Sequence, residues 1–314
     1  MVKRQKNIAF SKPDIGLQER LAVSRVLKSG WLAAGPETEL FEKEFADYVG
    51  VKYAIFTNSG TAALKMAYKW VKENGVNSVY IPKNTFCATY SAAAEIGLNF
   101  SFLGKMNHPS HRVNVHYGGV KDSTPCLIED SAHRIEANDP LIGKIRCYSF
   151  YATKNMTTGS GGMLVTKDKE IYERCRLYWK DGLSSSTRER QSGNSWRYEI
   201  KAYSGGYDGN DIAAAIGRVQ LKRLPEFIKR RNEIVAIYNQ NFKQKWTGNH
   251  LYPYFVKSQK HIAQLITYLK IRGINCGYHY PGNNWLGVSL PLYPLLKNSE
   301  IKYISDSVKN FHPN

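Results

Sequence analysis

Residues 149–162 read Ser-Phe-Tyr-Ala-Thr-Lys-Asn-Met-Thr-Thr-Gly-Ser-Gly-Gly, with Lys154 near the centre. A lysine surrounded by hydroxyls and glycines, just after a short apolar strand, is poorly suited to a protein core. Its amine can form a Schiff base with an aldehyde cofactor once burial or neighbouring cations lower its pKa. The hydroxyls can bind a phosphate, and the glycines let the backbone approach a ligand closely. The stretch therefore predicts a covalent cofactor anchor rather than a solvated lysine in a turn.

This stretch is one of several short motifs that occur in order along the chain. The others are residues 29–36 (SGWLAAGP), 58–64 (NSGTAAL), 82–86 (PKNTF), 129–133 (EDSAH), 211–217 (DIAAAIG) and 278–281 (YHYP). Together they resemble the DegT/DnrJ/EryC1/StrS aminotransferases, often called sugar aminotransferases, from about residue 8 to about residue 296. One such match would be weak, whereas this many in order is specific.

The resemblance implies an α/β fold of the fold-type I, pyridoxal-phosphate-dependent transferase class, in a shortened member. The apolar pattern agrees with it, because expected strands alternate with expected helices, which predicts a mostly parallel central sheet covered on both faces. Strands are expected at 53–57, 78–81, 100–103, 113–116, 126–128, 145–150 and 163–166. Helices are expected at 16–28, 37–48, 59–72, 86–94, 168–181 and 211–221, with a long loop at 182–209.

Two domains are expected. Residues 1–224 form a large cofactor-binding domain that includes the N-terminal segment, and residues 225–314 form a linker helix and a small C-terminal α+β domain. Pro225 is expected to start the linker helix, which runs to about residue 242. The small domain is expected to hold helices near 261–272 and 299–310 and a strand at 274–278.

Lys154 and Asp130 are the predicted catalytic residues. Asp130 follows an expected strand, so it lies at the strand's carboxyl end, where open α/β sheets bind ligands. A carboxylate there would keep the pyridine nitrogen of pyridoxal 5'-phosphate protonated; the alternative is an ordinary helix N-cap. Glu129 points the other way on the strand and is not expected to touch the ring.

The remaining cofactor contacts come from helix geometry and from the resemblance. Gly60 and Thr61 start a helix after a strand, so their amides suit a phosphate, although simple capping by Ser59 is an alternative. The resemblance implies that Ser149 binds the phosphate and that Phe86 stacks on the ring, unless Phe86 is a core residue. It also places His133 near the ring hydroxyl.

The implied reaction moves an amino group from an amino acid donor to a carbonyl acceptor through the Lys154 Schiff base, with ping-pong kinetics. The family-typical acceptor is a keto nucleotide sugar. His279 and Tyr280, in the C-terminal motif, are candidate substrate residues.

The loop before residue 211 departs from the family pattern. Gly206 stands where asparagine is expected and Asp208 where arginine is expected, in a loop that would reach the neighbouring subunit's site. An acid there would favour a cationic substrate end, unless Asp208 only caps the following helix. Alternatives are therefore an enzyme acting on a small, possibly basic, amino acid or diamine of the ornithine or lysine type, by transamination or α-decarboxylation, and a non-catalytic regulatory homologue. The intact Lys154 and Asp130 argue against the last.

Composition sets the remaining expectations for this chain of 314 residues. Its formal charge of +18 comes from lysines and arginines spread along the whole sequence, so a nucleic-acid partner is unlikely. No apolar run is long enough to cross a bilayer. Five dispersed cysteines without a CxxC pair argue for free thiols and against a metal site. A cytoplasmic homodimer with shared active sites is expected.

Overall fold

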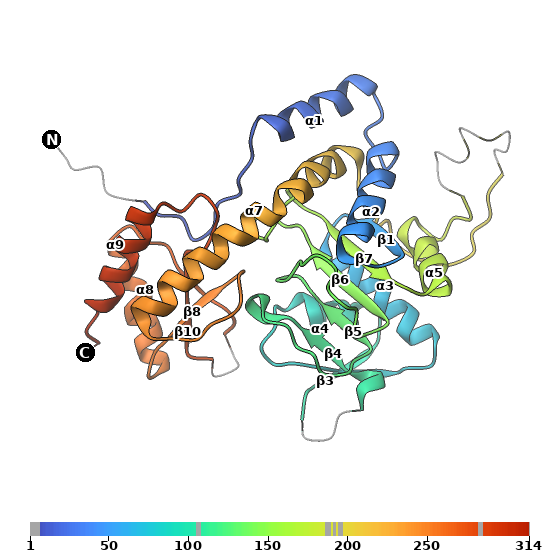
Figure 1. Ribbon diagram of the computed structural model, residues 1–314. Helices are drawn as coiled ribbons and strands as arrows, with labels where there is room; N and C mark the ends of the chain where they lie inside the picture. Colours follow the sequence, from blue (N-terminus) through green and yellow to red (C-terminus); the bar gives the residue numbers. More distant parts are fainter. Residues whose placement is uncertain are drawn as a thin grey trace.

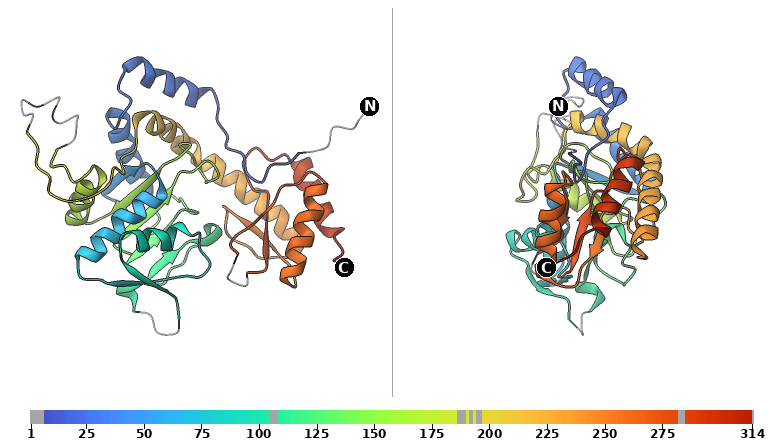
Figure 2. Two further views of the ribbon diagram at one scale, coloured as in Figure 1. Left: turned by 180° about the vertical axis from the view of Figure 1, so that it is seen from behind. Right: turned by 90° about the vertical axis from the view of Figure 1, so that its left-hand side faces the viewer.

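The structure is a computed structural model that describes residues 7–104, 108–185, 190, 193, 197–281 and 285–313. A long helix, α7 (Asp211–Phe242), connects a sheet-centred part of the molecule with a smaller cluster of C-terminal elements (Figures 1 and 2). None of the helices in these ranges is both long enough and apolar enough to cross a membrane.

The central sheet has the strand order β1-β7-β6-β5-β4. Its strands are β1 (Tyr53–Thr57), β4 (Val113–Val115), β5 (Ile128–Asp130), β6 (Ile145–Ser149) and β7 (Gly162–Thr166). A parallel pair, β2 (Ser78–Ile81) and β3 (Asn99–Phe102), extends it through a parallel bridge between Tyr80 and Arg112. Strand β7 is antiparallel to both neighbours, and β4, β5 and β6 are mutually parallel. The prediction of a mostly parallel α/β sheet is confirmed.

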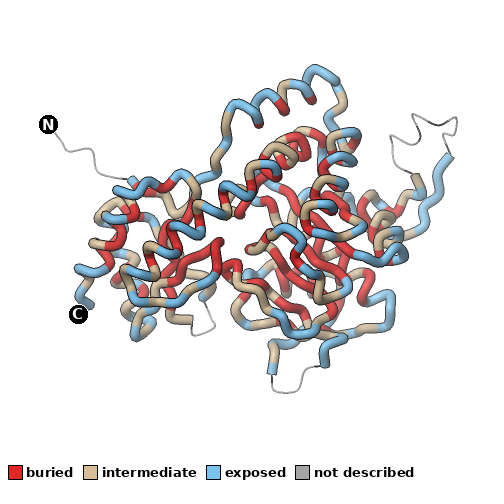
Figure 3. The backbone as a smooth tube through the Cα atoms, in the orientation of Figure 1, coloured by how far each residue is buried: buried red, intermediate tan, exposed pale blue. Residues whose placement is uncertain are grey.

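Helices cover both faces of this sheet. Along β1 the side chains alternate, since Ile55 packs toward one hydrophobic cluster and Ala54 and Phe56 toward another. The first face carries α3 (Gly60–Glu73), α4 (Ala88–Glu95) and α5 (Lys169–Trp179), and the second carries α2 (Pro36–Val49) and the first half of α7. Helix α1 (Leu17–Ser29) packs on α7. Buried residues therefore follow the strands in the interior (Figure 3).

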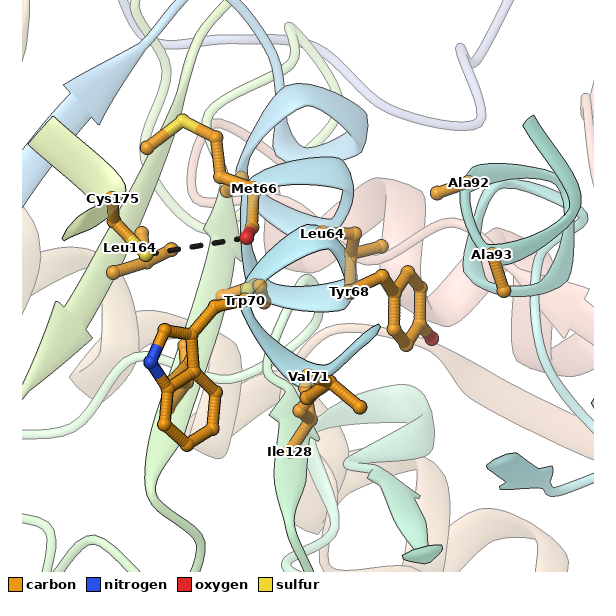
Figure 4. Close-up of a cluster of buried hydrophobic side chains, with 14 of the residues drawn as sticks. Leu64, Met66, Tyr68, Trp70, Val71, Ala92, Ala93, Ile128, Leu164 and Cys175 are labelled. Atoms are coloured by element: carbon orange, nitrogen blue, oxygen red, sulfur yellow. Dashed lines mark hydrogen bonds between the residues drawn. The ribbon is translucent and has the colours of Figure 1, made fainter. Parts of the chain in front are cut away.

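Helix α3 supplies much of the first cluster. Its apolar side chains are spaced so that Leu64, Tyr68 and Val71 share one side of the helix. They belong to one cluster with residues from α4, β5, β7 and α5 (Figure 4), namely Ala92, Ala93, Ile128, Leu164 and Cys175, of which Cys175 contacts the Met66 carbonyl of α3. This packing fixes the N-terminus of α3 at the end of the sheet, where the expected phosphate contacts lie.

The C-terminal part is built on a three-stranded antiparallel sheet in the order β8-β10-β9. Its elements are β8 (Tyr252–Phe255), α8 (Gln259–Ile271), β9 (Gly277–Tyr278), β10 (Gly287–Leu290) and α9 (Asn298–Lys309). Their cluster includes Ile234 and Tyr238 of α7 and also Ile8, which forms a bridge with Ile274. Leu221 and Leu224 of α7 belong instead to the large part. The cores thus change along α7, near the predicted domain boundary, which stays a prediction.

Two local predictions are corrected. Helices expected separately at 211–221 and from Pro225 onward form one helix, with Pro225 inside it. The packing of both halves of α7 on different cores outweighs the hydrogen bond that a proline cannot make. The strand expected at 274–278 is reduced to β9, and β8 and β10 were missed. Pro253 argues locally against a strand at the position of β8. A proline is tolerated there because β8 is an edge strand.

Candidate active site

A cavity of about 420 Å³ lies at the end of the central sheet. Its wall includes residues from far-apart segments of the chain: the N-terminal segment, the start of α3, the start of α4, the ends of β5 and β6, and the C-terminal part. Nine of the predicted site residues line it: Gly60, Thr61, Phe86, Asp130, His133, Ser149, Lys154, His279 and Tyr280.

Lys154 is held at the cavity by a tight turn, in which its backbone N–H donates to the carbonyl oxygen of Tyr151 at 2.9 Å. Burial of the amine lowers the pKa of Lys154 to about 8, and the Asp130 carboxylate opposes that shift. With such a pKa about a tenth of the amine is unprotonated, and therefore nucleophilic, at pH 7.

Asp130 is a buried carboxylate with fixed orientation. Oδ2 accepts a hydrogen bond from the Thr89 hydroxyl at 2.7 Å, and Oδ1 accepts one from the Ala132 N–H at 3.0 Å. The hydroxyl oxygens of Thr85 and Thr89 are 2.6 Å apart. Because Thr89 donates to the carboxylate, its oxygen must accept from Thr85. No helix starts after Asp130, so the alternative of a helix N-cap is wrong.

The start of α3 forms a small concave surface with neighbouring backbone. Ser59 caps the helix by accepting from the Ala62 N–H, which leaves the amides of Gly60 and Thr61 in the first turn, where a helix cannot bond them. A Cβ on Gly60 would lie 2.9 Å from that of Ser149, and one on Gly162 only 2.5 Å from the Ser59 carbonyl. Only glycine permits this close approach, and the concave surface with its free backbone amides suits an anion.

Phe86 and three polar aromatic residues cover another side of the cavity. Phe86 is 54% exposed, so the alternative of a core phenylalanine is excluded, and its ring lies 5.7 Å from that of Tyr280. His133 lies 3.2 Å from the Tyr280 hydroxyl through Nε2. His279 bonds the Ser289 hydroxyl through Nδ1 at 2.9 Å.

Burial controls the charge of these imidazoles. It holds the pKa of His133 well below its ordinary value and lowers that of His279 to about 4, with the Lys154 amine adding to both shifts. Both rings are therefore neutral near pH 7 and act as hydrogen-bonding groups rather than as cations.

Asp208 is not among the residues that line this cavity. Its carboxylate lies 3.4 Å from the Lys180 ammonium, and its backbone forms a bridge with Thr57. Asn210, rather than Asp208, caps α7 by accepting from the Ala213 N–H at 2.9 Å. The capping alternative is therefore wrong, and a contact of Asp208 with a partner's site stays a prediction.

Glu129 points away from the cavity, as strand alternation predicts. It accepts hydrogen bonds from Arg146 at 2.6 Å and pairs with His116 at 3.0 Å, in a fully buried network. The paired charges hold β5 against β6, directly beside Asp130.

Sequence reasoning missed several residues of the site. Thr85 and Thr89 orient Asp130, the tilted ring of His250 contacts that of His133 with centroids 4.3 Å apart, and Phe10 stacks on His279 at 5.2 Å. The two threonines stand four apart, which could have indicated one face of a helical turn. His250 and Phe10 carry no such local signal.

A lysine of lowered pKa and a fixed carboxylate at one cavity, at the end of such a sheet, agree with the resemblance to aminotransferases. The model of the DegT/DnrJ/EryC1/StrS aminotransferase family matches residues 13–115 and 121–287. The chain belongs to this family and is an aminotransferase.

Named relatives agree with this assignment. The chain is 36% identical over 277 residues to the spore coat polysaccharide biosynthesis protein SpsC of Bacillus subtilis, covering 77% of this chain and 71% of that protein. It is 28% identical to a dTDP-4-dehydro-2,3,6-trideoxy-D-glucose 4-aminotransferase of Saccharopolyspora spinosa, with 95% of both chains covered. Among solved structures, Helicobacter pylori PseC, an aminotransferase of pseudoaminic acid biosynthesis, superposes with a TM-score of 0.85 at 25% identity, over 97% of this chain and 98% of that one.

Proposed function

We propose that this aminotransferase binds pyridoxal 5'-phosphate in the cavity and aminates a keto sugar carried on a nucleotide, with an amino acid such as glutamate as donor. The observation that carries the proposal is the Lys154 amine, whose lowered pKa and place beside Asp130 suit a reversible covalent anchor.

The residues present fit the cofactor, which the family implies. Lys154 would hold the aldehyde and Asp130 the pyridine nitrogen. The amides of Gly60 and Thr61, with Ser149, would hold the phosphate, and Phe86 and His133 would contact the ring. When bound, pyridoxal phosphate supplies an electron sink that labilises bonds at the amino-bearing carbon.

The chain's own groups supply orientation and proton transfer. The hydrogen bonds from Thr89 and Ala132 fix the orientation of the Asp130 carboxylate, which would accept a hydrogen bond from a protonated ring nitrogen. The Lys154 amine, unprotonated in about a tenth of molecules at pH 7, can remove a proton from the substrate carbon and return it.

The charge of the cavity favours a sugar over a basic amino acid. Among the described residues that line it, Lys154 is the one basic and Asp130 the one acidic side chain, histidines aside. Asp208 pairs with Lys180 outside this cavity, so within one chain it adds no negative charge to the cavity wall. An uncharged ring bearing hydroxyls fits such a wall, and two of the relatives above are named for aminotransfer in sugar biosynthesis.

The test is a panel of substrates. Reconstituted protein is incubated with glutamate and a series of 3-keto and 4-keto UDP- and dTDP-sugars, and products are identified by mass spectrometry. Formation of an amino nucleotide sugar supports the proposal. Turnover of ornithine or lysine, with no amination of any sugar, would contradict it.

The lowered pKa of Lys154 predicts how cofactor attachment depends on pH. The protonated amine cannot attack an aldehyde, so the rate should rise about tenfold per unit below pH 8 and level off above it. Stopped-flow absorbance with pyridoxal phosphate and apoprotein measures the rate. N-α-acetyl-lysine is the control, because its amine keeps an ordinary pKa. A protein rate that keeps rising beyond pH 10 would contradict the burial of the amine.

Assembly and location are further parts of the proposal. Six large apolar side chains near the N-terminus are exposed, which favours a homodimer that covers them: Ile15, Leu17, Leu21, Leu27, Leu32 and Leu40. Light scattering should then give twice the mass of 35.7 kDa, and the mass of a single chain would contradict the dimer. The five cysteines are free, which agrees with the proposed cytoplasmic location.

A further inference from the structure

His250 lines the cavity from the segment between α7 and β8, a position to which no role is assigned above. It is 6% exposed, and its ring lies against that of His133 at a tilt of 33°. Burial, and then the neighbouring His133, hold the pKa of His250 well below its ordinary value. The ring is therefore neutral, with a proton on one nitrogen and a lone pair on the other.

A chain of hydrogen bonds decides which nitrogen carries the proton. The Glu136 carboxylate can only accept, so the Asn249 amide nitrogen donates to it at 3.2 Å. The oxygen of Asn249 then accepts from the Asn155 amide nitrogen at 3.1 Å. The oxygen of Asn155 in turn lies 2.9 Å from Nδ1 of His250.

Because the Asn155 oxygen can only accept, Nδ1 of His250 must donate and carries the ring proton. Nε2 then has the lone pair. Among the described residues no hydrogen bond to Nε2 is found, and the ring contributes to the cavity wall. His250 therefore presents an acceptor to whatever occupies the cavity.

The neighbouring residues His133 and Tyr280 present a hydrogen-bond donor to the cavity instead of an acceptor. Nδ1 of His133 accepts from the Gly118 N–H at 3.2 Å, so its neutral ring carries the proton on Nε2 and donates to the Tyr280 oxygen. The hydrogen of the Tyr280 hydroxyl is then free to donate into the cavity. A ligand that both accepts from Tyr280 and donates to His250 matches this wall.

The donor on the ligand is a neutral group. Burial disfavours positive charge at His133, His250 and His279, and the Lys154 amine adds to this effect. A cation on the ligand would lose its hydration in the same surroundings, whereas a hydroxyl carries no charge to desolvate.

We propose that His250 determines substrate specificity by accepting, through unprotonated Nε2, a hydrogen bond from a hydroxyl of the sugar substrate. The donating hydroxyl of Tyr280 contacts an oxygen of the same substrate. The inference rests on the proposed function for the identity of the ligand, and on the burial of the ring together with the hydrogen-bond chain for the state of the imidazole.

The state of the imidazole is tested by nitrogen NMR on cofactor-loaded protein with labelled histidine. The His250 signals are assigned by their loss in His250→Asn, with His312→Asn at an exposed histidine as control. We expect a proton on Nδ1 and none on Nε2 at neutral pH. A proton on Nε2, alone or with one on Nδ1, would overturn the proposal.

The role in specificity is tested by calorimetry with UDP-glucose, dTDP-glucose and their monodeoxy analogues. One deoxy analogue should bind wild type about five- to tenfold more weakly than its parent, the effect of one neutral hydrogen bond. In His250→Asn, which keeps a donor toward Asn155, that difference should vanish, and His250→Gln should restore part of it.

The outcomes distinguish a failure of the role of His250 from a failure of the proposed function. Equal weakening of parent and analogues by His250→Asn would overturn this inference and leave the proposed function intact. Failure of wild type to bind any nucleotide sugar, while glutamate still transfers its amine to another carbonyl, would overturn both.

Discussion

Replacing Lys154 with alanine should lower kcat for transamination by about 10⁴-fold or more, because the change removes both the anchor and the group that moves the substrate proton. The three histidines of the cavity cannot substitute as bases, since burial holds their pKa values low. Steady-state rates on the aminated sugar, or on any acceptor that the panel reveals, measure the effect.

The matched control for this variant is Lys302→Ala, which removes a lysine whose side chain is 79% exposed. It should leave kcat within about twofold, since exposed ion pairs contribute little. Circular dichroism should show the same fold for both proteins. If Lys154→Ala kept more than about a hundredth of the wild-type rate, another residue would have to be the base.

Replacing Asp130 with asparagine should lower kcat by about 10²–10³-fold, the usual effect of removing one preorganised electrostatic group. An amide cannot hold a ring nitrogen protonated. It also has one oxygen for the two donors Thr89 and Ala132, so one of them would face an NH₂ group. Loss of the carboxylate should further lower the pKa of Lys154, because Asp130 raises it in the wild type.

Two measurements separate this role from a general loss of structure. The pH midpoint for cofactor attachment should move downward in Asp130→Asn and stay in place in Asp306→Asn, whose parent side chain is 49% exposed. Near-normal turnover in Asp130→Asn, with the cofactor bound, would show that a different group supports the ring.

The sequence predicts the sheet-centred part of the fold well, because its strands and helices have clear local sequence patterns. Strand β1 ends at Thr57, shortly before the Gly60 that starts α3, and β5 ends in Asp130, so sequence order alone places Gly60 and Asp130 at one edge of a sheet. The resemblance to a family of aminotransferases is confirmed by the family match.

The parts that escaped prediction depend on distant contacts. Local rules place Pro225 at the start of a new helix, yet α7 runs through it, and its two halves pack on different cores. His250 lines the cavity on a segment that a hydrogen bond between Asn155 and Asn249, 94 positions apart, joins to the segment after Lys154. Such a pairing has no period or spacing that sequence reasoning could detect.

The most direct measurement of the central claim is the site of covalent cofactor attachment. Protein loaded with pyridoxal phosphate is reduced with borohydride, digested, and mapped by mass spectrometry. We predict a pyridoxyl group on the peptide that contains Lys154, and its absence from that peptide in Lys154→Ala. A stable adduct on a different lysine, or no adduct on wild-type protein at saturating cofactor, would contradict the account.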